Sequence, residues 1–217
     1  DLTEVKVRSR QTNKPDKYIV SECAKVLRDE LPYNLHIFVN SVEFIAKVID
    51  TLKLAPEAVK IVCSTSGESR QENQRKLGNA YPIGQPFDPA KKINFYTSTC
   101  FEGCDIFDPD GVTFIVSDGR KAHTLLDIST LFTQICGRIR DSRYKAQIVH
   151  VYSTTKYSKA VTLDEFVAAT QRTLAQAEKF ASDINAVDEP SREKLLKKIP
   201  YINEQYVRIA DNRLVVE

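Results

Sequence analysis

Five short apolar runs constrain the fold of this chain more than any other feature of its sequence. They lie at residues 35–39, 59–63, 92–96, 112–117 and 146–152. A short run of this kind is typical of a parallel strand that is buried on both faces. Several of the intervening segments repeat their apolar residues at helical spacing. Strands that alternate with helices predict a mostly parallel α/β sheet flanked by helices.

The segments around these runs predict the helices. Residues 15–30 form an amphipathic pattern that begins near Pro15, and Ser41 is a suitable N-cap for a helix after the first run. A polar helix is expected at residues 69–77, and a helix with one apolar face at residues 129–138. The alternating residues 2–8 predict an edge or linker strand.

The pattern changes after the fifth run. Thr162-Leu-Asp-Glu165 is a capping box that opens an amphipathic helix, and a shorter helix is expected after Pro190. Asp211-Asn212 predicts the turn of a β-hairpin near the end of the chain. We therefore expect residues 1–160 to form one domain and residues 161–217 to form a helical and hairpin extension.

Composition and charge narrow the classes of partner. The chain has 217 residues, of which 42% are hydrophobic and 28% charged, and this composition fits a folded domain with a sizeable core. A net charge of +2 does not favour a whole-surface electrostatic grip on nucleic acid, although it is compatible with a local basic face. No apolar run approaches the ~20 residues of a membrane span, and no signal peptide is present, so we expect no membrane partner.

The five cysteines and three histidines predict no metal site. The cysteine count is odd and the spacing matches no disulfide framework, so we expect reduced thiols and a cytoplasmic location, or a nuclear one in a eukaryote. Cys100 and Cys104 form a C-x3-C pair without a second pair, and we expect them to be packing residues. The chain begins at Asp1 and contains no Met, which indicates an internal fragment of a longer protein.

The residues after the third run combine a threonine, a glycine and an aspartate, groups suited to a phosphate-rich ligand. Gly103 follows Thr97 by six residues and Asp105 follows it by eight. This spacing resembles motif V of superfamily 2 helicases, which lies in the second of their two RecA-like lobes. The resemblance implies that Gly103 and Asp105 face a bound nucleotide and that Thr97 contacts nucleic acid.

A second pattern, Q-x-x-G-R-x-R, combines Gln134, Gly137, Arg138 and Arg140. It resembles motif VI of the same family, in a short form similar to that of viral origin-binding helicases; the more common position of the second arginine is Asp141 here. The resemblance implies that Gln134, Arg138 and Arg140 are catalytic and that Gly137 binds nucleotide. Arginine suits this role because it stays charged and presents a rigid set of donors.

The two arginines set a condition on the local backbone. In a continuous helix Arg138 and Arg140 would point about 200° apart. Both can therefore face one nucleotide only if the helix breaks near Gly137 and Arg138. Arg143 is a weaker candidate for the same role.

Two earlier regions extend the resemblance to residues 30–155. Residues 35–41 and the helix after them resemble motif IV, and Ser64-Thr-Ser-Gly67 with Gln71 and Arg75 resembles the loop and helix that follow it. The resemblance implies contacts with single-stranded DNA or RNA, in which hydroxyl and backbone N–H groups hold phosphates without reading sequence. The residues concerned are Ser41, Thr65, Ser66, Gly67 and Thr97. For each hydroxyl residue, helix capping or turn formation is the alternative role.

The sequence has no G-x-x-x-x-G-K-[ST] phosphate-binding loop and no convincing acidic pair for Mg²⁺. We therefore expect ATP and Mg²⁺ to be bound mainly by the N-terminal RecA-like lobe of the same parent chain. The present chain is expected to hold neither group and to be inactive alone. Its predicted function is the C-terminal lobe of an ATP-dependent helicase or translocase with a RecA-like fold. The alternative is a non-catalytic scaffold with this fold that binds nucleic acid or protein; a Rossmann enzyme is disfavoured because no glycine-rich fingerprint follows a strand.

Overall fold

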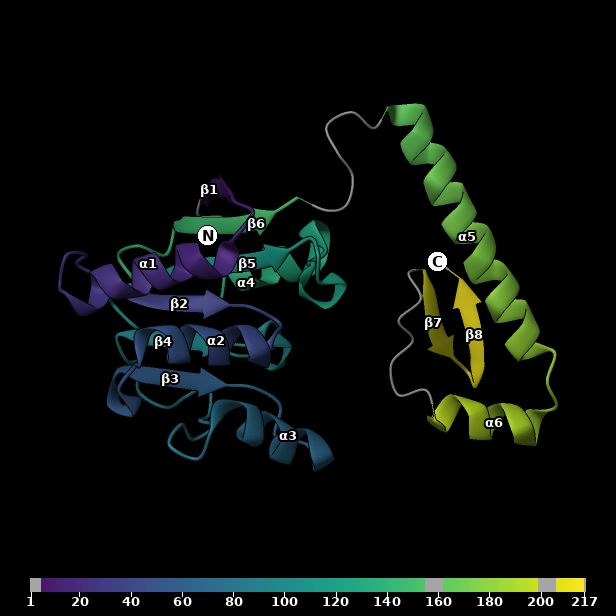
Figure 1. Cartoon of the computed structure of the whole chain (residues 1–217), viewed down its shortest axis with the longest axis horizontal. Coiled ribbons are helices and arrows are strands. Elements are labelled where there is room, and N and C mark those ends of the chain that lie inside the picture. Colours follow the sequence, from purple (N-terminus) through teal and green to yellow (C-terminus); the bar gives the residue numbers. More distant parts are fainter. Residues whose placement is uncertain (1–4, 155–161, 199–205, 217) are drawn as a thin grey trace. The chain divides into compact units, whose positions relative to one another are not determined.

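The computed structural model describes residues 5–154, 162–198 and 206–216 (Figure 1). The chain divides into two units, Asp1–Lys156 and Tyr157–Glu217, and each is described by itself. The boundary expected between residues 160 and 161 lies outside the described residues.

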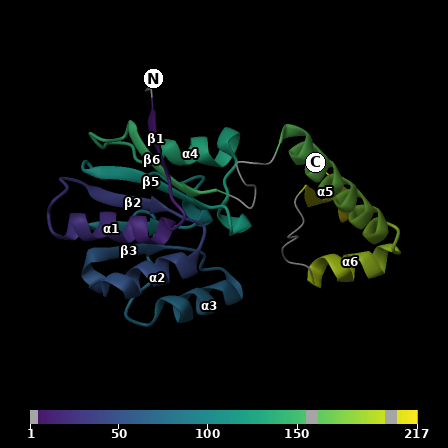
Figure 2. The same cartoon turned by 45° about the horizontal axis from the view of Figure 1, so that its top comes forward.

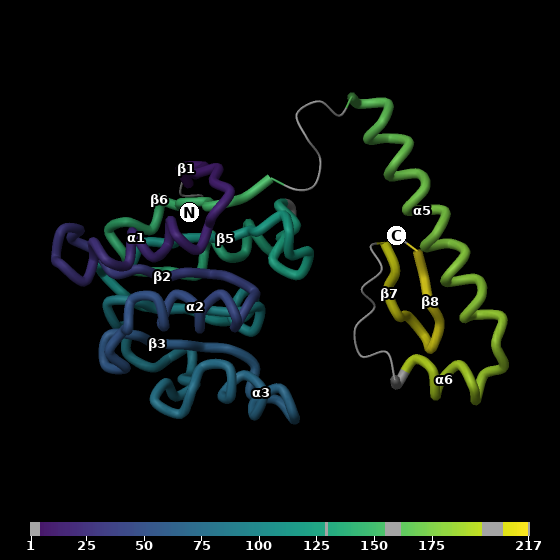
Figure 3. Tube along the Cα trace, in the orientation of Figure 1, coloured from purple at the N-terminus to yellow at the C-terminus, as the bar shows by residue number. Residues whose placement is uncertain are grey.

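The first unit is built on a six-stranded sheet in which every neighbouring pair of strands is parallel. The order across the sheet is β1-β6-β5-β2-β4-β3. The strands are β1 (Lys6–Gln11), β2 (Asn34–Phe38), β3 (Val59–Val62), β4 (Ile93–Tyr96), β5 (Gly111–Asp118) and β6 (Gln147–Ser153). The predicted parallel α/β sheet is thus confirmed. The five apolar runs form β2 to β6, and the N-terminal segment adds β1 beside β6 at the edge (Figure 3).

Four α-helices belong to this unit in its described part. They are α1 (Pro15–Leu27), α2 (Val42–Leu52), α3 (Gly67–Leu77) and α4 (Thr133–Cys136). Figures 1 and 2 show α1 and α2 over one face of the sheet, here called the first face, and α4 on the opposite, second face. Side chains from α1, α2 and α3 pack into the core of the first face, whereas α4 packs with residues 100–106 on the second.

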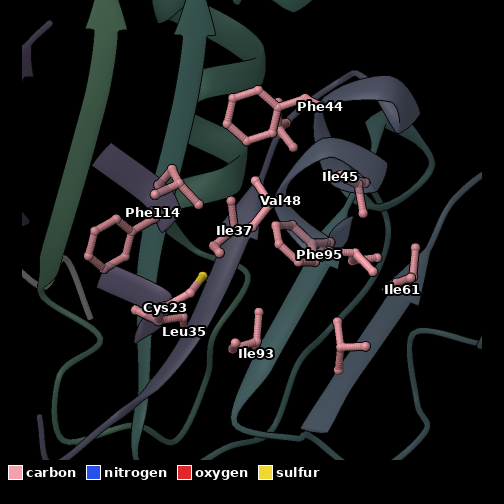
Figure 4. Packing of buried hydrophobic residues seen from close by; sticks show 14 of the residues in the cluster. Cys23, Leu35, Ile37, Phe44, Ile45, Val48, Ile61, Ile93, Phe95 and Phe114 are labelled. Carbon is pink, nitrogen blue, oxygen red and sulfur yellow. The ribbon is translucent and has the colours of Figure 1, made fainter. Parts of the chain in front are cut away.

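Side chains of the strands alternate between the two faces of the sheet and contribute to the hydrophobic core on each face. Ile37 and Phe114 point to the first face, where they pack with Cys23 and Phe44 of the helices (Figure 4). The next residue of β2, Phe38, points to the second face and packs in the other cluster. Successive side chains of a strand alternate between faces, so a strand covered on both faces must be apolar at almost every position. This requirement explains why polar residues do not alternate with apolar residues in the five runs.

A buried polar network interrupts the apolar sheet. His36 of β2 is fully buried, with its Nε2 2.8 Å from Asp108 Oδ2 and its Nδ1 3.0 Å from the Tyr96 hydroxyl. Burial lowers the pKa of His36, although the Asp108 carboxylate acts in the opposite direction. Burial acts to raise the pKa of Asp108, but hydrogen bonds from His36 and Asn34 outweigh it, and this pKa lies below its ordinary value. Both ring nitrogens of His36 are thus hydrogen-bonded, as is usual for a buried polar side chain.

The second unit combines two helices and a hairpin: α5 (Leu163–Asn185), α6 (Glu189–Lys198), β7 (Val207–Ala210) and β8 (Arg213–Val216). The predicted capping box is present: Thr162 and Glu165 cap one another at the start of α5. The predicted turn is also present, with positive φ at Asp211 (47°) and Asn212 (60°) between antiparallel strands. Ala181, Leu196 and Leu214 form the small core of this unit.

Candidate functional site

The segment that carries the two arginines is not a continuous helix. A π-helical turn spans Ile128–Phe132, α4 spans only Thr133–Cys136, and Gly137 caps its C-terminal end. The helix expected over residues 129–138 is therefore present as these two consecutive segments, but it ends at Cys136, two residues earlier than expected. Beyond Gly137 the chain becomes extended, because Ile139 forms a parallel bridge with Ile106 and its side chain is buried.

This break meets the condition set by the two arginines. Because the helix ends before Gly137, Arg138 and Arg140 are not carried on one continuous helix, and Ile139 between them is buried in the core. The bridge is held by two backbone hydrogen bonds, from Ile106 N–H to Arg138 O (2.9 Å) and from Arg140 N–H to Ile106 O (3.0 Å). The segments that resemble motifs V and VI, more than 30 residues apart in sequence, therefore lie side by side.

Arg138 is buried and holds these segments together. Its Nε donates to Gln134 O (2.9 Å), its Nη1 to Cys104 O (3.1 Å) and its Nη2 to Gln134 Oε1 (2.9 Å). Only 8% of the residue is exposed. The Gln134 side chain is engaged with Arg138, so both residues position the site.

Arg140 has a different environment. Its side chain is 48% exposed, and its Nε donates to Asp105 Oδ1 at 2.7 Å. The Asp105 carboxylate is exposed to the same degree, at 49%. The pair is therefore open to solvent and to an approaching anion. Arg143 is not part of this pair: its Nε donates to Asp110 (2.8 Å), and its guanidinium lies over the Tyr144 ring.

Gly103 and Gly137 determine the course of the backbone around the site. Gly103 has a φ of +71°, a conformation that strains any residue with a Cβ, and it turns the chain just before Cys104 and Asp105. Gly137 ends α4 and lets the chain leave the helix toward Arg138. Both glycines therefore shape the segments that carry the polar groups.

A second set of predicted residues lies at the carboxyl ends of the strands. The strands β5, β2, β4 and β3 are neighbours, so the loops that follow them form a continuous row at one edge of the sheet. Asn40 links three of these loops, although it is not among the predicted site residues. Its Nδ2 donates to His123 O (2.9 Å), and its Oδ1 accepts from Ser98 N–H (3.3 Å). The sequence did contain a signal for this residue, because Asn40 is a polar residue between the end of a predicted strand and the predicted helix cap Ser41.

The predicted nucleic-acid residues divide into two groups at this edge. Ser41 is buried and its Oγ accepts from Phe44 N–H (3.3 Å), so it has the helix-capping role that was its alternative. Thr97 is 6% exposed, and its Oγ1 lies 3.4 Å from Thr99 Oγ1. In contrast, Thr65, Ser66 and Gly67 are exposed in the loop that opens α3. This loop is the accessible part of the row.

The surface of α3 continues from this loop. Two arginines and three amide side chains line a shallow depression of about 560 Å³: Arg70, Gln71, Gln74, Arg75 and Asn79. The Gln74 amide is held by donation to Gly78 O (2.8 Å) and Tyr81 O (2.9 Å), which fixes the C-terminal end of the helix. This depression therefore lies along the same helix, α3, that the loop of Thr65 and Ser66 opens.

Asp118, at the end of β5, is a further polar residue that lies outside the predicted motifs. Its carboxylate accepts from the Arg120 guanidinium (2.9 Å) and from Ser153 Oγ (2.7 Å). The Arg120 hydrogen bond is the main cause that lowers the pKa of Asp118 to about 2, although burial opposes it. This cluster fastens the loop after β5 to the end of β6. The signal in the sequence was Asp118-Gly-Arg120 directly after an apolar run.

In comparisons with models of protein families and with curated proteins, nothing matches this chain. Within the described ranges, no three His, Cys, Asp or Glu side chains are grouped so that they could hold a metal ion. Among the helices that the structure describes, none has the length and apolar character needed to cross a membrane.

Proposed function

We propose that this chain is the C-terminal RecA-like lobe of an ATP-dependent superfamily 2 helicase or translocase. The observation that carries the proposal is the contact between two patterns recognised separately in the sequence. Gly103 and Asp105 come from one, Gln134, Arg138 and Arg140 from the other, and the Arg140–Asp105 pair joins them at 2.7 Å.

Arg140 is the residue we assign to the phosphoryl groups of ATP. Its guanidinium is half exposed and is held by one equally exposed carboxylate, so it can exchange or share that partner with an anion. Arg138 is a positioning residue, because its donors are directed at Gln134 and Cys104 within the chain. ATP and Mg²⁺ would be held mainly by an N-terminal RecA-like lobe, since this sequence has no phosphate-binding loop. When bound there, they supply the phosphoryl group whose transfer the arginine assists.

The loop Thr65–Gly67 and the face of α3 are the part of the edge that we assign to single-stranded DNA or RNA. Hydroxyl and backbone N–H groups with nearby arginines suit phosphates and not base edges. The near-neutral net charge predicts weak binding by the isolated chain, micromolar or weaker. Five free cysteines, none in a disulfide, fit a cytoplasmic location, or a nuclear one in a eukaryote.

Replacing Arg140 in the parent protein tests the catalytic part of the proposal. Arginine fingers contribute roughly 10³–10⁵ to the rate of phosphoryl transfer. Arg140→Ala should therefore reduce ATP turnover by a factor in this range while nucleotide affinity stays close to that of the wild type. Arg143→Ala is the matched control, because Arg143 is also exposed and ion-paired but belongs to another pair. Wild-type turnover by Arg140→Ala would contradict the proposal and favour the non-catalytic scaffold.

Two measurements on the 217-residue chain test the remaining parts. The pure chain should show no ATP turnover that is stimulated by nucleic acid. Stimulated turnover that persists through repeated purification would refute the proposal that this chain is a lobe that is inactive alone. Arg75→Ala should weaken binding of a fluorescent single-stranded oligonucleotide at low salt. Lys76→Ala is its control, because Lys76 is on the same helix but pairs with Glu72 at 2.7 Å. Equal effects of both variants would show that α3 contributes only general charge.

A further inference from the structure

The loop that carries Asp105 also contains two cysteines that lie close together. Cys104 Sγ donates to the backbone carbonyl O of Cys100 at 3.1 Å. Cys100 is fully buried, whereas Cys104 is partly exposed. Because Cys104 is partly exposed and contacts the fully buried Cys100, the pair suits the roles of an attacking and a resolving thiol.

From this geometry we propose that Cys104 and Cys100 form a peroxide-reactive site that closes to an intramolecular disulfide. In the first step the Cys104 thiolate attacks a peroxide oxygen: an S–O bond forms, the O–O bond breaks and hydroxide leaves. In the second step the Cys100 sulfur attacks the sulfenic acid sulfur: an S–S bond forms, the S–O bond breaks, and the thiol proton leaves with the hydroxide as water. Two thiols are oxidised and one peroxide is reduced to two molecules of water.

The charges around Cys104 support its role as the attacking thiol. The interaction with Cys100 is the largest cause that lowers the pKa of Cys104, and it raises the pKa of Cys100; for Cys104, burial and the Asp105 carboxylate oppose the shift and the cations of Arg138 and Lys60 assist it. A thiol whose pKa is lowered is more ionised at neutral pH and therefore more reactive than its neighbours.

The remaining cysteines lack this assistance. Burial raises the pKa of Cys136 to about 11, that of Cys63 to about 11 and that of Cys23 to about 12. Cys136 is also partly exposed, so it is the matched comparison: access is similar, but no second thiol or guanidinium stabilises its thiolate. The structure therefore predicts selective oxidation at Cys104.

The disulfide would constrain the loop that the arginines depend on. Cys104 O accepts the hydrogen bond from Arg138, and Asp105 is its neighbour in the chain. Any change in ATP turnover on oxidation rests on the proposed function, whereas the thiol chemistry does not. Measuring the thiols directly keeps the two questions separate.

Peptide mass mapping of the whole chain after peroxide treatment tests the site. Both cysteines lie in one tryptic peptide, residues 93–120, so the disulfide lowers the mass of that peptide by two hydrogens. We expect this loss in the wild type and in Cys136→Ser. In Cys100→Ala we expect a Cys104 sulfenic acid that dimedone traps, with no loss of two hydrogens. Oxidation of Cys136 as fast as Cys104, or a wild-type peptide that stays reduced, would overturn the proposal.

A labelling experiment that needs no variant gives a second test. The rate of iodoacetamide modification should rise at a lower pH at Cys104, whose pKa is lowered, than at Cys136, whose pKa is raised. Parallel pH profiles at the two cysteines would also overturn the proposal. For the mass-mapping experiment, far-UV circular dichroism of Cys100→Ala and Cys136→Ser checks that these variants retain the fold.

Discussion

Replacing Arg138 and Arg140 one at a time separates the effect of a buried arginine from that of an exposed one. Arg138 makes three hydrogen bonds from a charged group that is 8% exposed. At about 1.5 kcal/mol for each bond from a charged donor, their sum is roughly 4.5 kcal/mol. The bonds share one guanidinium, and water can enter part of the space that alanine leaves. We therefore expect Arg138→Ala to lower the free energy of unfolding by about 2–4 kcal/mol.

Arg140→Ala removes one ion pair whose two side chains are about half exposed. Exposed pairs of this kind contribute about 0.2–1 kcal/mol, so the free energy of unfolding should fall by less than about 1 kcal/mol. Arg138→Lys keeps the charge but cannot reproduce the planar set of donors, and it should lie between the two alanine variants. The two arginines are thus expected to differ in stability although they are two residues apart.

Urea unfolding of the intact 217-residue chain measures this difference. Hydrogen exchange of the peptide that contains β5 (Gly111–Asp118) reports on the first unit without interference from the second. With a urea slope of about 1–3 kcal/mol per M, Arg138→Ala should lower the unfolding midpoint by about 1 M or more. Equal midpoints for Arg138→Ala and Arg140→Ala would refute the division between the two residues, because burial would then have no energetic consequence.

Three further predictions concern the residues that frame the site. Ser41→Ala removes the side-chain cap of α2 and should lower the free energy of unfolding by about 1 kcal/mol, measured by urea titration. Gly111→Ala should cost about 1–3 kcal/mol and lower the melting temperature, because its Cβ would lie 2.9 Å from the buried His36 ring; an unchanged melting temperature would contradict this packing. The carboxylate of Asp118 should contribute about 1–2 kcal/mol above pH 5, lost as pH falls from about 4 toward 2, since its pKa is lowered to about 2 by Arg120. Asp118→Asn should remove that part of the acid dependence, and an acid unfolding curve that keeps its wild-type shape would argue against it.

Local patterns in the sequence determined most of the secondary structure. The five apolar runs became β2 to β6, because a strand covered on both faces needs apolar residues throughout. The capping box at Thr162 and the turn at Asp211 were also readable, since each depends on residues within four positions of one another. The spacing of Gly103 and Asp105 and of Gln134 and Arg138 marked both halves of the candidate site.

Only the tertiary structure decided how the marked residues divide their roles. The helix that was expected to reach Arg138 ends at Cys136, because Ile139 gains a partner in Ile106, more than 30 residues earlier in the chain. The same long-range contact buries Arg138 and leaves Arg140 half exposed. Sequence spacing reports the direction of a side chain within its own element, whereas its burial and its hydrogen-bond partners depend on segments distant in the chain. For that reason the sequence could name both arginines but could not tell which of them is buried and which is exposed.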